Sequence, residues 1–167
     1  MQMGAQEHGF WTDPATPAAL PEAQQSFAAG AARRLEALGD AVATFEAGAE
    51  VLPGVVAVAT PGHTPGHTSF AVGTPAEGVF VTGDFITMPL SFARPDIGAE
   101  TDHDPAQAAE TRKATLARLA EAGLRVAGAV QRNTDRGADC ACDMDVLVLG
   151  EEDMPIRISQ SLGSGSS

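Results

Sequence analysis

A nine-residue segment of threonine, proline, glycine and histidine, residues 60–68 (TPGHTPGHT), most constrains how this 167-residue chain can fold. It directly follows the apolar run 55–59 (VVAVA), whose lack of alternation predicts a strand buried on both faces. Glycine and proline favour a fixed turn after that strand, so that His63 and His67 lie at the strand-to-loop junction. A rigid strand positions an imidazole there for a metal, while the loop leaves a coordination position open.

Short β-rich runs around this segment predict a sheet. The runs are 41–45, 55–60, 69–72 and 78–82, each bounded by glycine, proline or acidic residues. The last run ends in Gly83 and Asp84, which places a carboxylate after a second strand. If the two strand ends lie at the same edge of the sheet, His63 and Asp84 meet there.

Two helices are predicted beside the sheet. A pattern of apolar residues at four-residue spacing indicates a helix over 21–39, stopped by its final glycine. A second helix over 104–123 begins with Asp104 as its N-cap and ends at another glycine. Residues 125–130 predict one more strand, whereas the glycine and proline content of residues 1–20 is typical of a loop.

Charge and composition limit the partners and the location that we expect. The net charge of −12 gives a surface that repels nucleic acid and anionic lipid. The longest apolar run is far shorter than the ~20 residues of a membrane span, and residues 1–15 lack a secretory pattern. Cys140 and Cys142 form a C-x-C pair, which suits neither a zinc ribbon nor a C-x-x-C redox motif. We therefore expect a cytoplasmic protein without nucleic-acid or membrane partners.

Several spaced motifs together resemble the metallo-β-lactamase-fold hydrolases, in the branch that holds methyl parathion hydrolase and N-acyl homoserine lactonases. In order, they are 7–11 (EHGFW), 58–70, 81–84 (VTGD), 90–95 (LSFARP) and 102–112. The resemblance implies an α/β fold, a partial αββα sandwich that retains mainly the second sheet and its flanking helices. Residues 1–130 would form this partial domain, and residues 131–167 a divergent C-terminal segment with a flexible Gly/Ser tail.

The resemblance also implies roles for individual residues. His63 matches a metal-binding histidine of the family, and Asp84 matches the aspartate that bridges two metal ions. His67 matches a residue that orients the ligand loop by hydrogen bonding, and Phe10 and Trp11 are expected to pack as core or as the wall of the substrate pocket. In the family, a hydroxide held by two zinc or other divalent ions attacks a carbonyl or phosphoryl centre. The implied substrates are small lactones, esters or phosphotriesters, and no catalytic residue is assigned beyond the ligands.

The chain departs from the family's ligand pattern at two places. The H-x-H-x-D-H cluster that precedes the E-x-x-F-W segment has no counterpart before Phe10, and no histidine follows His103. One histidine and one carboxylate fall short of the three or four protein ligands of a zinc site. We therefore expect low or no hydrolase activity from this chain alone. The alternatives are a non-enzymatic remnant that acts as an interaction module, and one half of a split site completed by a partner chain.

A partial sandwich exposes a sheet face that the other half would cover. An uncovered apolar face of that kind favours dimerisation, aggregation or a complementing chain. We therefore expect the isolated chain to be marginally stable or self-associated, with a homodimer or a complementing chain as the partner.

Overall fold

A seven-stranded sheet forms the main layer of the computed structural model, which describes residues 1–74, 77–129, 144–147 and 158–159. The strands of this sheet follow chain order: β3 (Glu50–Leu52), β4 (Val55–Ala59), β5 (Thr68–Val72), β6 (Val79–Val81), β7 (Arg125–Ala129), β8 (Met144–Leu147) and β9 (Ile158–Ser159). Neighbouring strands are antiparallel except β6 and β7, which are parallel. A separate two-stranded parallel sheet joins β1 (Gln2–Gly4) to β2 (Ala43–Phe45).

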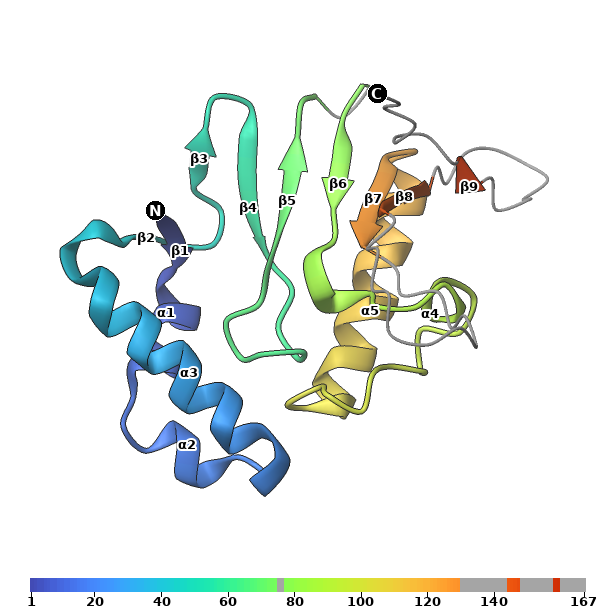
Figure 1. Cartoon of the computed structure of the whole chain (residues 1–167). Helices are drawn as coiled ribbons and strands as arrows, with labels where there is room; N and C mark the ends of the chain where they lie inside the picture. Colours follow the sequence, from blue (N-terminus) through green and yellow to red (C-terminus); the bar gives the residue numbers. More distant parts are fainter. Residues whose placement is uncertain (75–76, 130–143, 148–157, 160–167) are drawn as a thin grey trace, which may run out of the picture.

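The helices lie in two groups. Residues before the main sheet form α1 (Ala5–Thr12), α2 (Thr16–Ala19) and α3 (Glu22–Leu38), followed by the 3₁₀ turn η1 (Gly39–Ala41). Between β6 and β7 come the 3₁₀ turn η2 (Gly83–Phe85), α4 (Leu90–Ala93) and α5 (Pro105–Glu121). Figure 1 shows the first group with the small sheet beyond the β3 edge, and α5 beside β6 and β7. The predicted α/β fold, a partial sandwich with one large sheet and its flanking helices, is confirmed.

Helix α5 packs on the main sheet and contributes to the hydrophobic core. Its start is as predicted, because the Asp104 side chain accepts a hydrogen bond of 2.9 Å from the backbone N–H of Gln107. Five buried side chains of α5 and of the strands and turn beneath it form one cluster: Phe80, Phe85, Ile86, Leu119 and Val126. The parallel strands β6 and β7 must be joined by a segment that crosses from one end of the sheet to the other. Helix α5 lies in this connection and packs back onto the two strands.

The prediction that strand 55–59 is buried on both faces is wrong. Ala57 is 1% exposed, but the neighbouring Val56 is 37% exposed. The core beneath α5 is built mainly from β6 and β7, so the edge strands receive less cover. On the face opposite α5, Val72 and Val81 are each 38% exposed, because no second apolar layer lies over them within the described part of the chain. The apolar run 55–59 therefore forms a strand whose two faces are only partly covered.

The prediction of a loop over residues 1–20 is also wrong, because this segment contains β1, α1 and α2. No residue of α1 is buried and its apolar and polar residues are not segregated, so its local sequence signal is weak. Contacts with distant residues, described below, stabilise it instead. Helix α3 matches its predicted range. Of the apolar residues at four-residue spacing, Leu35 is buried but Phe27 is 69% exposed, and the neighbouring Ala28 is buried in its place.

The C-terminal region is described only in part. Residues 146–149 and 156–159 are also strand-like in sequence, and strands β8 and β9 lie near these two runs and extend the main sheet beyond β7. The polar segment 131–139, the Cys140–Cys142 pair and the Gly/Ser tail lie outside the described residues. The division at residue 130 stays a prediction. Among the described helices, none combines the length and the apolar character that crossing a membrane requires.

Candidate metal site

His63 and Asp84 meet at one edge of the main sheet. Strands β4 and β6 both run antiparallel to β5 and thus parallel to each other, so their C-terminal ends lie at the same edge. The Nε2 atom of His63 lies 3.8 Å from Oδ2 of Asp84. The His63 side chain is 18% exposed and that of Asp84 is 64% exposed. The two residues that follow these strands, as the sequence predicted, therefore form a pair that is open to solvent on the Asp84 side.

The loop that carries His63 is held tightly between two helices. A Cβ atom at Gly62, whose φ is 132°, would collide with the backbone of Ala108 in α5. A Cβ atom at Gly66 would collide with the backbone of Glu7 in α1. The two glycines of the motif are therefore required by the close approach of α5 on one side and α1 on the other. This contact fixes the loop that positions both histidines.

Glu7 fastens α1 to this loop through hydrogen bonds. One carboxylate oxygen accepts from the Thr64 hydroxyl at 2.6 Å and from the Gly66 backbone N–H at 3.2 Å. The other oxygen accepts from the Trp11 indole N–H at 2.6 Å. The glutamate of the E-x-x-F-W segment thus links that segment directly to the histidine motif, a role that the sequence alone did not assign.

Asp102 supports His63 from inside the protein. Its Oδ1 lies 3.1 Å from Nδ1 of His63, and its Oδ2 lies 3.1 Å from a terminal nitrogen of Arg112. The side chains of Asp102 and Arg112 are 1% and 3% exposed, so the pair is buried. Sequence reasoning missed both residues as part of the site, although both lie within the resembling segment 102–112. The only sequence signal is the acidic pair that flanks His103 just before α5.

The charges at this site shift two pKa values in opposite directions. The hydrogen bond to Asp102 raises the pKa of His63, with a further contribution from Asp84, and both outweigh the lowering effect of burial. Burial by itself raises the pKa of Asp102, but the hydrogen bonds from His63 and Arg112 prevail and the pKa of this carboxyl is lowered. Asp102 is therefore ionised at neutral pH, and His63 holds a proton on the nitrogen that faces it.

His67 occupies a different position, with both ring nitrogens in hydrogen bonds. Its Nε2 accepts from the backbone N–H of Asp84 at 3.0 Å, so the ring proton lies on Nδ1 and is donated to Thr60. The Thr60 hydroxyl in turn lies 2.8 Å from that of Ser69, which donates to the carbonyl of Thr82. Burial, followed by the nearby His63, lowers the pKa of His67, and the neutral ring is favoured.

This hydrogen-bonded chain has one consistent direction. It runs from the Asp84 amide through His67, Thr60 and Ser69 to the Thr82 carbonyl, and thus joins the ends of β4, β5 and β6. The predicted role of His67, orienting the ligand loop by hydrogen bonding, remains an assignment by resemblance. Its contacts agree with that assignment, since it holds the backbone of Asp84 and leaves no nitrogen for a metal.

Phe10 and Trp11 pack against each other and against His103 and Phe27. Their ring centroids are 4.8 Å apart, Phe10 lies 5.2 Å from His103, and Trp11 lies 6.1 Å from the exposed Phe27. Both side chains are half-buried. Their role as a substrate-pocket wall stays a prediction.

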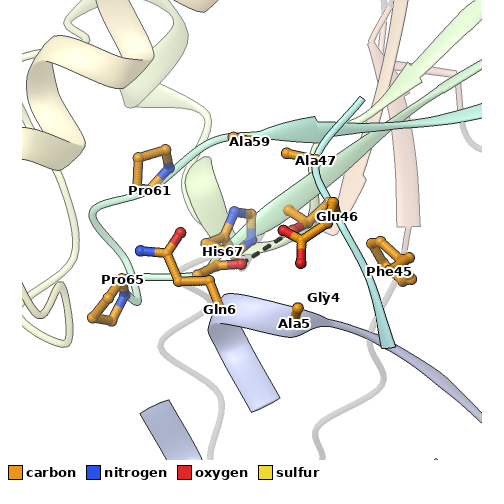
Figure 2. A pocket seen from close by; sticks show the side chains of 12 residues that line it. Gly4, Ala5, Gln6, Phe45, Glu46, Ala47, Ala59, Pro61, Pro65 and His67 are labelled. Atoms are coloured by element: carbon orange, nitrogen blue, oxygen red, sulfur yellow. Dashed lines mark hydrogen bonds between the residues drawn. The ribbon is translucent and has the colours of Figure 1, made fainter. Parts of the chain in front are cut away.

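A small pocket of about 50 Å³ lies beside the loop that carries the two histidines. Figure 2 shows it between α1, β2 and the loop, with Gln6, Glu46, Pro65 and His67 at its edge. Pockets that bind small molecules usually hold roughly 300–1,000 Å³. This pocket is too small for such a substrate, and neither His63 nor Asp84 lines it.

The His63–Asp84 pair fits part of a metal site. Imidazole and carboxylate are ligands of zinc and similar ions at about 2 Å, and atoms 3.8 Å apart are close enough for one ion to contact both. A zinc site needs three or four protein ligands. No group of three histidine, cysteine, aspartate or glutamate residues with metal-binding geometry occurs among the residues that the structure describes. The pair thus supplies ligand types that suit zinc, but fewer ligands than a zinc site needs.

Comparison with known proteins supports the assignment of the fold. The family model of the metallo-beta-lactamase superfamily matches residues 5–128. A second model, of a protein family of unknown function (DUF2478), matches residues 99–167 and overlaps the first. A comparison with curated proteins gives no match.

Two solved structures are similar to most of this chain. The hydrolase AbOPH of the beta lactamase superfamily matches with a TM-score of 0.69 and 26% identity over 91% of this chain. AidC, a dizinc quorum-quenching lactonase, matches with a TM-score of 0.70 and 20% identity over 92% of this chain. In both cases the match covers 55% of the other chain, so this chain spans about half of the length of either protein.

Proposed function

This chain belongs to the metallo-beta-lactamase superfamily, and we propose that it carries one part of a metal-dependent hydrolase site, with His63 and Asp84 as metal ligands. The substrates would be small lactones, esters or phosphotriesters, and this chain alone would have low or no activity. The observation that carries the proposal is the approach of the His63 imidazole and the Asp84 carboxylate at the sheet edge where β4 and β6 end.

The surroundings of this pair support a ligand role over a structural one. His63 has one nitrogen engaged by Asp102 while the other faces the exposed Asp84 carboxylate. A histidine ligand of a metal usually has this arrangement, in which the second nitrogen is held by a carboxylate or carbonyl. Asp84 is held through its backbone by His67, which leaves its side chain free to bind.

Zinc or another divalent ion bound here would acidify water and polarise a carbonyl or phosphoryl oxygen. The residues of this chain would orient two of its ligands and hold the proton of His63 away from the ion. The remaining ligands must come from elsewhere, because an imidazole and a carboxylate alone bind zinc weakly. The similarity to a hydrolase and to a dizinc lactonase, each matched over about half of its length, supports this division.

Zinc binding by single variants tests the proposed ligands. We expect weak Zn²⁺ binding by the full chain, observed in NMR as a shift of the backbone amide resonances of residues 62–68, and we expect His63→Ala and Asp84→Asn each to abolish Zn²⁺ binding. His103→Ala, which removes an exposed histidine nearby, is the matched control and should bind as the unmodified chain does. Zinc-induced shifts that persist in both ligand variants would refute the assignment. Two tightly held zinc ions per chain, measured by elemental analysis, would refute the incompleteness.

A complementing chain is the partner that we propose to complete the site, because part of the sheet face opposite α5 is apolar and exposed among the described residues. Cross-strand pairing places Phe70 beside Val81 and Val72 beside Val79 on the face opposite α5. Val72 and Val81 are each more than a third exposed, and an apolar face of this kind favours association. A homodimer that uses the same face, and an interaction module without catalysis, are the competing possibilities.

Sedimentation experiments separate these possibilities. We expect the chain to self-associate at micromolar concentration and Val81→Lys to reduce that association, because a charge on the face would have to be buried. Ala114→Lys, at an exposed position on α5, is the control. A monodisperse monomer that unfolds cooperatively would exclude the homodimer and contradict the expected self-association. A zinc-dependent hydrolase activity that appears in a stable homodimer would exclude the complementing chain.

A further inference from the structure

The buried pair of Asp102 and Arg112 contacts His63 and the turn that carries Asp84. An ionised carboxylate can only accept hydrogen bonds, so the Nδ1 atom of His63 must donate to Asp102. When the ring is neutral, its Nε2 lone pair is then directed toward Asp84. The carboxylate therefore selects the one tautomer of His63 whose free nitrogen faces its neighbour at the sheet edge.

Arg112 connects the same carboxylate to the chain around Asp84. Its Nε donates to the carbonyl of Pro95 at 2.9 Å, and one terminal nitrogen donates to Asp102 at 3.1 Å. That terminal nitrogen also lies 3.5 Å from the carbonyl of Phe85, the residue that follows Asp84. One buried guanidinium thus contacts both the carboxylate behind His63 and the turn that carries Asp84.

Burial of this ion pair is difficult to explain by stability alone. Removing two charges from water is unfavourable, and an apolar pair of similar volume is often as stable. Here every buried polar side-chain atom of the described residues has a hydrogen-bond partner. Gly98 completes the enclosure, because a Cβ atom there would collide with both Arg112 and Asp102. The pair is tightly packed and fully satisfied, as expected of groups that hold a geometry.

We infer that Asp102 and Arg112 are positioning residues for the His63–Asp84 pair, with Asp102 fixing the tautomer and ring orientation of His63 and Arg112 tying that carboxylate to the Asp84 turn. The inference rests on the proposed ligand roles of His63 and Asp84. It assigns no contact with substrate to either residue. It predicts a property of the metal-free chain, the tautomer of His63, that does not depend on hydrolase activity.

The tautomer can be measured by ¹H–¹⁵N correlation of the histidine rings in the full chain, at a pH where His63 is neutral. We expect the proton on Nδ1 in the unmodified chain. In Asp102→Asn the amide NH₂ group must face either Arg112 or Nδ1, and only the second avoids two opposed donors. The Nε2–H tautomer of His63 should therefore become populated, with the fold retained in far-UV circular dichroism. Asp96→Asn, in the exposed Arg94–Asp96 pair, is the matched control and should leave the tautomer unchanged.

A second variant keeps both charged groups. In Gly98→Ala the added methyl group pushes against Asp102 and Arg112, so the His63 tautomer should shift in the same direction even if Asp102→Asn fails to fold. Zinc titration of the folded variants should show an affinity lowered by about 10–100-fold, the usual effect of losing a partner of a histidine ligand. A merely structural role would change stability and leave the tautomer as it is.

The outcomes separate this inference from the proposed function. An Nε2–H tautomer in the unmodified chain, or a tautomer unaffected in both variants, would overturn the inference whether or not zinc binds. An Nδ1–H tautomer that is lost in the variants supports it. Failure of Zn²⁺ to bind a chain with the Nδ1–H tautomer would overturn the proposed metal site and leave the positioning of His63 intact.

Discussion

His63 and His67 lie four residues apart in one loop, yet the structure gives them different surroundings. His67 is neutral and has both nitrogens in an internal hydrogen-bonded chain that joins three strand ends. His63 has one nitrogen held by a buried ion pair and the other facing an exposed carboxylate. His67 thus holds the loop by hydrogen bonds, whereas His63 directs one nitrogen toward the Asp84 carboxylate. Two identical side chains in a repeated sequence thus differ because different elements approach them.

The largest expected effect comes from the buried support of His63. Asp102→Ala leaves Arg112 buried without its partner, and we expect a loss of about 3–5 kcal/mol in the free energy of unfolding. Asp96→Ala removes the exposed Arg94–Asp96 pair and should cost at most about 1 kcal/mol. Urea unfolding of the two variants measures both values. Equal losses would mean that the Asp102–Arg112 pair has no special structural weight.

The two histidines should respond differently to alanine substitution. His67→Ala removes a partner of the Asp84 amide and of Thr60, so we expect a loss of about 1–3 kcal/mol, with or without Zn²⁺. His63→Ala should instead abolish the rise in Tm that Zn²⁺ gives to the unmodified chain, because a ligand that binds only the folded state stabilises it. Thermal unfolding with and without Zn²⁺ separates the two. A zinc-dependent rise that survives His63→Ala would remove the distinction between the histidines.

A smaller effect is expected where α1 holds the loop. Thr64→Val removes the hydroxyl that donates to Glu7, and we expect a loss of about 0.5–1.5 kcal/mol. The Gly66 amide still donates to the same carboxylate, which limits the loss. Thr101→Val, at an exposed position, serves as the control. If Thr64→Val is neutral in urea unfolding, the loop does not depend on Glu7 for its position.

The smallest effect is the opposite pH dependence of the two rings. The pKa of His63 is raised above its usual 6.5, mainly by Asp102, so its contribution to stability is full below pH 6.5 and is lost as the pH rises through the folded value. The pKa of His67 is lowered by burial, so its contribution is present above pH 6.5 and is lost as the pH falls. NMR titration should show His63 losing its proton at the higher pH. The reverse order would contradict the environments described for both rings.

Parts of the fold follow from local patterns. The N-cap at Asp104, the stop glycine at the end of each long helix and the strand before the histidine motif all match the prediction. Each rests on short-range chemistry: a side chain that satisfies a nearby N–H group, a residue that allows positive φ, or a run of β-branched residues. Helix α1 has no such signal, because its stabilising contacts join Glu7 to residues 57 and 59 positions away.

The site divides in the same way between sequence and structure. The sequence by itself determined that a histidine and an aspartate follow two strands, because turn residues and strand periodicity are local properties. The tertiary structure alone decided that Asp102, 39 positions from His63, would hold that ring, and that Arg112 would be buried instead of solvated. It also decided that Val72 and Val81 are exposed among the described residues. These outcomes depend on how α5 is rotated and seated on the sheet, and no local pattern encodes the distance between two elements that meet only when the chain is folded.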